Sequence, residues 1–186
     1  MRNLNPTLWR TCRVLSGANR IKLLRQIHDH PGQAVSELAL AVDIGRSAAS
    51  QELRRIQSRG LLRAERKDNR VVYRMEADPQ VPSAAPLLKA LNTAFSSFPP
   101  ARDGDLREIA FGLAYPRRIA IAQMLQAAPQ SDLELCVALN LSSFAVFTHA
   151  RTLQKCGWVK RVHGRCQFTP PTHPLAHALV RLLRDP

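Results

Sequence analysis

The strongest constraint on the fold is an internal repeat that spans most of the chain. Residues 19–24, 38–44 and 60–63 resemble residues 117–122, 135–141 and 157–160, respectively. The first pair of segments is 98 positions apart and the other two pairs are 97 apart. So constant a spacing indicates two copies of one structural unit, and the same elements are expected in the same order in each copy.

Helices account for most of each copy. Apolar residues at three- and four-residue spacing predict an amphipathic helix over residues 19–28, with its equivalent starting at Pro116. A short helix and then a longer one are predicted at residues 36–42 and 46–59, and again at 132–139 and 143–156. Gly60 and Gly157 follow the longer helices, where glycine adopts the left-handed conformation of a helix end without steric cost. Ser131 and Glu134 match a capping box at the start of the second short helix.

A β-hairpin and a last helix complete each copy. The strands are predicted at residues 61–66 and 70–75, around a turn at 67–69, and at 158–162 and 165–169, around His163 and Gly164. In the returning strands, alternation predicts that Val71, Tyr73 and Met75 face the core, as do Cys166 and Phe168, whereas Arg70, Val72 and Arg74 face solvent. The closing helices are predicted at residues 86–98 and 174–184. We therefore expect a mainly α protein with small β-hairpins (α+β), built as two tandem winged helix-turn-helix domains at residues 1–98 and 105–186, with a linker at 99–104.

Composition narrows the function. The net charge of +13 favours a polyanionic partner, because basic residues that neutralise phosphates release the counterions condensed on DNA. We find no phosphate-binding glycine loop, nucleophile motif or paired carboxylates, so we do not expect an enzyme. The sequence also shows no export signal, membrane span or CxxC pair, and we therefore expect a cytoplasmic protein.

A family resemblance rests on short motifs distributed over residues 8–98. They are Leu15-Ser16, Asn19-Arg20-Ile21, Val35-Ser36-Glu37-Leu38-Ala39, Ser47-Ala48-Ala49-Ser50-Gln51-Glu52-Leu53, Gly60-Leu61-Leu62 and Val72-Tyr73-Arg74. This pattern resembles the ArsR family of transcriptional repressors, whereas residues 105–186 depart from it. The resemblance implies sequence-specific binding to double-stranded DNA, with release by a small-molecule effector or a redox change. An architectural or chromosome-maintenance protein and a plasmid-type replication initiator are the alternatives.

The DNA-contacting residues are expected on the longer helix and the hairpin of the first domain. In a helix-turn-helix the second helix enters the major groove, and its exposed side chains meet base edges. Because Ala49, Leu53 and Ile56 form the apolar stripe of this helix, the opposite face points outward. The residues expected to contact DNA are Arg46, Ser47, Ser50, Gln51 and Arg54 on the helix, and Arg66, Lys67 and Arg70 on the hairpin.

The second domain has a different surface. Phe144 and Phe147 stand where the first domain has Ser47 and Ser50, and two exposed aromatic residues at this spacing suggest a protein-contact patch. Its hairpin still carries candidate phosphate contacts, namely Lys160, Arg161 and Arg165.

No cofactor and no metal site are expected. ArsR-type metal sensing would place a thiolate pair near residues 36–41, and this sequence has no cysteine there. Cys136 and Cys166 are expected to act as small core hydrophobes, at the positions of Ala39 and Val71. His173 and His177 lack a third ligand, and Cys12 stands alone.

Quaternary structure follows from the same resemblance. ArsR-type repressors dimerise through the first and last helices of each subunit, and here one chain supplies four such helices, at residues 4–15, 86–98, 105–113 and 174–184. We therefore expect an intramolecular pseudo-dimer. The alternative is a homodimer assembled through Phe144 and Phe147.

Overall fold

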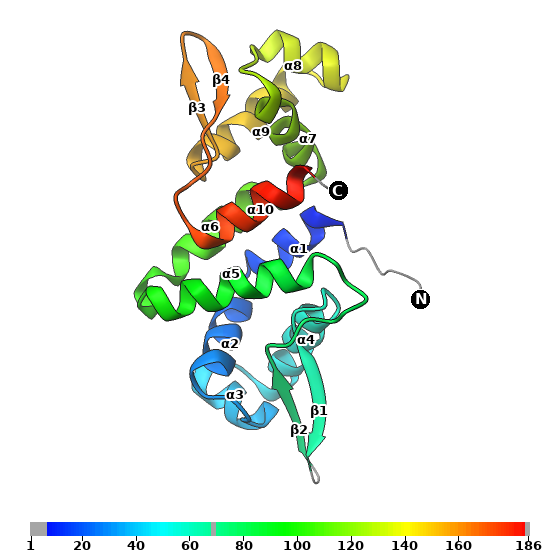
Figure 1. Cartoon of the computed structure of the whole chain (residues 1–186), viewed down its shortest axis with the longest axis vertical. Helices are drawn as coiled ribbons and strands as arrows, with labels where there is room; N and C mark the ends of the chain where they lie inside the picture. The colour runs from blue at the N-terminus through cyan, green and yellow to red at the C-terminus, as the bar shows by residue number, and fades with distance from the viewer. Residues whose placement is uncertain (1–6, 68–69, 185–186) are drawn as a thin grey trace.

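The computed structural model describes residues 7–67 and 70–184, and over these residues the protein is mainly helical with two small antiparallel hairpins (Figure 1). The predicted α+β class is therefore confirmed. The first unit comprises α1 (Leu8–Leu15), α2 (Ala18–Asp29), α3 (Val35–Val42), α4 (Arg46–Gln57), β1 (Arg63–Lys67), β2 (Arg70–Arg74) and α5 (Ala84–Ser97). The second unit comprises α6 (Asp103–Gly112), α7 (Pro116–Ala127), α8 (Asp132–Leu139), α9 (Ser143–Lys155), β3 (Val159–Val162), β4 (Arg165–Phe168) and α10 (Pro174–Arg184). The two units thus have the same elements in the same order.

The short helices α3 and α8 end in the same way. Asp43 and Asn140, which are 97 positions apart, both have left-handed backbone conformations, with φ of 57° and 50°. Asp and Asn tolerate this conformation better than most residues, because their short side chains can bond locally. At the start of α8, Ser131 Oγ accepts from the Glu134 N–H and the Ser131 N–H donates to Glu134 Oε2, so the predicted capping box is confirmed.

The longer helices α4 and α9 bury corresponding positions. Ala49, Leu53 and Ile56 of α4 are fully buried, as the sequence predicts. The residues 97 positions further on in α9, which are Val146, Ala150 and Leu153, are also buried. The same three-and-four spacing therefore docks each helix on the core of its unit.

The alternation predicted for β2 is wrong at Val71 and Val72, whereas Tyr73 is buried as predicted. Val71 is 43% exposed, whereas Val72 and Tyr73 are 3% and 5% exposed. The reason is a β-bridge between Val72 and Ala34, the residue before α3, which turns Val72 toward the core. Cys166 pairs with Gln130 before α8 in the same way and is buried, so it corresponds to Val72 and not to Val71. Cys136, also expected in the core, is only half-buried.

The two units pack together through helices from both, with α5 against α10 and α1 against α6 (Figure 1). Arg25 of α2 donates to the carbonyls of Phe95 and Phe98 at the end of α5 and to the carboxylate of Asp103. Gln123 of α7 stands 98 positions after Arg25, and its amide donates to the Leu183 carbonyl near the end of α10. Equivalent positions therefore fasten the last helix in each unit.

Two predicted boundaries change in the structure. Residues 99–104 are not an open linker, because they contain the 3-10 helix η1 (Pro100–Arg102) and the start of α6. Arg25 joins this segment to the first unit through Asp103, with 2.6 Å between Nη2 and Oδ1. The first helix begins at Leu8; residues 4–6 of its predicted range lie outside the described residues, as do Asp68 and Asn69 of the hairpin turn.

Trp158 anchors the second hairpin. Its ring is fully buried, and its Nε1–H donates to the Ile109 carbonyl of α6 at 2.9 Å. Gly112 makes room for it, since a Cβ there would lie 2.4 Å from Trp158 Cδ1. The hairpin is thus held on the helix that packs against the first unit.

Over the described residues, none of the helices has both the length and the apolar composition to cross a membrane by itself. The adjacent helices α8 and α9, bent by 114° at their junction, reach that threshold only as a pair.

Candidate nucleic-acid interface

The outward face of α4 is polar and cationic. Arg46, Ser47, Gln51 and Arg54 are exposed, and Ser50 is half-buried. These side chains lie opposite the stripe that docks α4 on the core, so the structure brings the predicted helix residues together on one surface. Arginine and glutamine can each form two hydrogen bonds with a base edge.

An ion pair between Arg20 and Glu52 holds α4 against α2. Arg20 Nη1 of α2 donates to Glu52 Oε2 at 2.6 Å, and Arg55 donates to Glu52 Oε1, also at 2.6 Å. The Arg20 guanidinium lies against Gly17, where a Cβ would come within 2.1 Å of Nη2. No sequence pattern links Arg20 to Glu52, because the two residues are 32 positions apart. The ion pair holds the candidate helix to α2 and leaves the outward face unobstructed.

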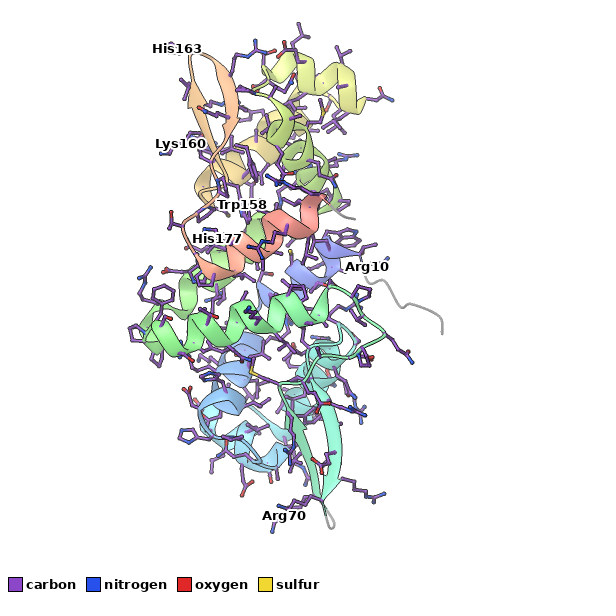
Figure 2. All side chains as sticks on the ribbon, in the orientation of Figure 1. Arg10, Arg70, Trp158, Lys160, His163 and His177 are labelled. Carbon is purple, nitrogen blue, oxygen red and sulfur yellow. The ribbon has the colours of Figure 1, made fainter. Side chains whose placement is uncertain are left out.

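The β1–β2 hairpin extends away from the body of the molecule, with Arg70 near its end (Figure 2). At the base of the hairpin, Arg63 pairs with Glu76 at 2.6 Å and Arg74 pairs with Glu65 at 2.8 Å. The residues nearer the tip are Arg66, Lys67 and Arg70, and all three are exposed. The hairpin is therefore neutralised at its base and cationic toward its end.

These cations are free of intramolecular ion pairs as far as the structure describes the chain. No carboxylate within residues 7–67 or 70–184 forms a salt bridge with Arg46, Arg54, Arg66, Lys67 or Arg70. A cation that has given up no hydration to an internal partner can neutralise an external phosphate at lower cost.

The corresponding face of the second unit is apolar. Phe144 and Phe147 on α9 are 80% and 51% exposed, and Leu133 and Val137 on α8 are 73% and 76% exposed. Exposed polar residues of α9 include Ser143, Thr148 and Arg151. The predicted aromatic patch is thus on the surface, and its role in protein contact stays a prediction.

The second hairpin uses two of its arginines within the unit. Arg161 donates two hydrogen bonds to Asp132 at 2.8 and 2.9 Å, and Arg165 donates to Glu134 at 2.7 Å. The Ser131 backbone N–H and Arg165 together hold the pKa of Glu134 below its usual value. Lys160 is exposed near the base of this hairpin (Figure 2). Of the three candidate phosphate contacts, only Lys160 forms no salt bridge with a described carboxylate.

The histidines and cysteines do not gather into a metal site. Among residues 7–67 and 70–184, no three His, Cys, Asp or Glu side chains come together in a suitable group. His173 Nδ1 accepts from the Leu175 N–H at the start of α10, and its ring stacks on Phe98. Burial raises the pKa of the Cys12 thiol to about 12.

A surface hollow lies where the two units meet. It has a volume of about 540 Å³ and is lined by α2, the end of α3 and the start of α6, including Lys22, Arg25 and Arg107. Its size falls within the range of small-molecule sites.

No family model, no curated protein and no solved structure matches this chain.

Proposed function

We propose that the protein is a sequence-specific, double-stranded-DNA-binding transcriptional regulator of the ArsR type, acting as a repressor. Each unit has the element order of a winged helix-turn-helix, in which α3 and α4 form the helix-turn-helix and β1–β2 the wing. In this arrangement α4 enters the major groove and the wing follows the adjacent backbone.

The observation that carries this proposal is the exposed face of α4. It combines side chains able to pair with bases, Arg46 and Gln51, with cations that have no described carboxylate partner. A structural helix face would gain stability from internal ion pairs, as Arg55 does with Glu52 on the same helix. Cations without a carboxylate partner among the described residues instead favour a phosphate-rich partner.

The second unit supports a division of labour within one chain. Its matching helix carries Phe144 and Phe147, and two arginines of its hairpin are engaged with α8. We therefore assign base recognition to the first unit alone. The packing of α1 and α5 against α6 and α10 supports the intramolecular pseudo-dimer, with the two units as unequal halves.

An electrophoretic mobility shift tests this function. The probe is the duplex upstream of the protein's own gene, and the competitor is random duplex of equal length. Retention of the probe in a large excess of random duplex is expected from a repressor. Equal loss of both would instead favour an architectural protein that binds without sequence preference.

A further inference from the structure

Two arginines occupy equivalent places in the two units. Arg20 in α2 and Arg118 in α7 are 98 positions apart, which is the offset of these two helices. Arg20 Nε donates to the Val14 carbonyl near the end of α1, and Arg118 Nη2 donates to the Phe111 carbonyl near the end of α6 at 2.8 Å. Each arginine therefore ties its helix to the helix before it.

The difference lies in what the longer helix offers to the arginine. In the first unit, Glu52 of α4 accepts from Arg20 at 2.6 Å. The residue 97 positions after Glu52 is His149 of α9. Arg118 forms no ion pair with any carboxylate of the described residues, and it is only 8% exposed. Its Nε is buried and has no acceptor within the part of the chain that the structure describes.

Among the described residues, the surroundings of Arg118 supply no compensating negative charge. The rings of Phe111 and Tyr115 lie 4.9 and 5.8 Å from the guanidinium carbon, and Tyr115 stacks on His149. Burial, with Arg118 and Arg117 close by, lowers the pKa of His149, so this ring is neutral at pH 7. Burial also raises the pKa of the Cys156 thiol near Arg118, and a protonated thiol carries no charge.

A buried cation without a counter-charge is costly, and it gains most from a partner that is both anionic and planar. The guanidinium fork matches a carboxylate, with which it can form two parallel hydrogen bonds. The first unit has such a partner in its own chain, whereas the second unit has histidine in place of glutamate.

We propose that Arg118 and His149 form a binding site for a small carboxylate, whose oxygens take the place that the Glu52 side chain has beside Arg20. The bound carboxylate links α7 to α9 as Glu52 links α2 to α4. The second unit therefore becomes more stable when the ligand is present, by mass action on the folded state. This site does not depend on DNA binding, so it can be tested whether or not the proposed function holds.

The test titrates the full-length protein with sodium acetate and, in a separate control titration, with sodium chloride, both at constant ionic strength. The readouts are the ¹⁵N-detected Nε–H signal of Arg118 and the melting temperature. Acetate is expected to shift the Arg118 signal along a saturable curve and to raise the melting temperature, and chloride to do neither. An unsaturable shift, or an equal response to chloride, would overturn the proposal.

Two exchanges between the units provide matched controls. His149→Glu supplies the carboxylate from the chain, so the Arg118 signal should sit near its acetate-bound position and respond no further to acetate. Glu52→His should create a second saturable response, at Arg20. Arg118→Lys keeps the charge but removes the fork and the Nε–H signal, so the melting temperature is its readout, and an acetate response at least tenfold weaker is expected. An acetate response that persists unchanged in His149→Glu or in Arg118→Lys contradicts the site, even if Glu52→His fails to fold.

Discussion

The two units bury the same positions of α4 and α9 but expose different chemistry on them. The buried stripe of Ala49, Leu53 and Ile56 has its counterpart in Val146, Ala150 and Leu153. On the exposed side, the first unit has Ser47 and Ser50 where the second unit has Phe144 and Phe147. Packing and surface therefore differ independently between the two copies, because the stripe alone decides whether the helix docks. The exposed side chains of the two copies can therefore differ while the fold is kept.

The largest effect is expected where the units fasten their last helices. Arg25→Met should lower the free energy of unfolding by about 3 kcal/mol, because it leaves Asp103, whose side chain is 14% exposed, without its counter-charge. Gln123→Met at the equivalent position removes one neutral hydrogen bond and should cost about 1 kcal/mol. Urea denaturation of both variants measures the difference.

Adding Asp103→Asn to Arg25→Met is the control for this comparison. The double variant no longer buries an unpaired carboxylate and should recover part of the stability. If the two single variants cost the same, the charge of Arg25 contributes nothing beyond its hydrogen bonds, and the two units are fastened alike.

Substitutions on α4 should impair DNA recognition, whereas matched substitutions on α9 should not. Arg46→Ala and Gln51→Ala are each expected to weaken specific binding by roughly 1–3 kcal/mol and to relax sequence preference, as removal of a two-bond base contact does. The matched changes Ser143→Ala and Thr148→Ala in α9 should leave affinity unchanged. Competition between operator and random duplex distinguishes the cases: equal weakening on both would mean that α4 contacts only phosphates.

The two hairpins should differ in their dependence on salt. Arg70→Ala is expected to weaken binding to all sequences and to make the slope of log K against log salt shallower by about one. Arg165→Ala should leave the slope unchanged, because Arg165 is bound to Glu134 within the second unit. If the slope changes with Arg165→Ala and not with Arg70→Ala, the phosphate contact belongs to the second hairpin, and our assignment to the first is wrong.

The capping box at the start of α8 should make the stability of the second unit depend on pH. The Ser131 backbone N–H and Arg165 hold the pKa of Glu134 below its usual value. Glu134 therefore contributes stability above the unfolded-state pKa, and this contribution is lost as the pH falls through the lower folded-state value. Glu134→Gln should flatten that part of the profile of unfolding free energy against pH. An unchanged profile would show that the cap does not depend on charge.

Much of the fold was predictable because the repeat gives each helix two independent sequences. The left-handed backbone conformation at the ends of α3 and α8 was also predictable. Both copies have a residue that tolerates this conformation at the same position, namely Asp43 and Asn140. The orientation of β2 was not, because Val71, Val72 and Tyr73 are all apolar and alternation cannot choose between them. The β-bridge from Ala34 to Val72 makes the choice, and it joins residues far apart in the sequence.

The residues of the candidate site on α4 and on the β1–β2 hairpin were predictable from the sequence. Which of the arginines form ion pairs was not. Whether an arginine is free depends on carboxylates from other elements. Arg161 and Arg165 pair with residues 29 and 31 positions away, and no local pattern indicates this. The unpaired Arg118 did leave a signal, because the repeat aligns His149 with Glu52 and so places a neutral residue where the first unit has a carboxylate.

The last prediction concerns the aromatic patch, and the expected effect is none. If the units form a pseudo-dimer within one chain, light scattering should give a mass near 20.8 kDa, and Phe147→Glu should leave it unchanged. If base recognition belongs to the first unit, as we propose, the footprint on the operator should be asymmetric. A doubled mass that Phe147→Glu returns to the single-chain value, together with a symmetric footprint, would instead show a homodimer. In that case the patch, whose Phe144 is 80% exposed, would join two chains and place two copies of α4 on a palindrome. Ser143→Ala, a small change beside the patch, is the control that should alter neither measurement in either arrangement.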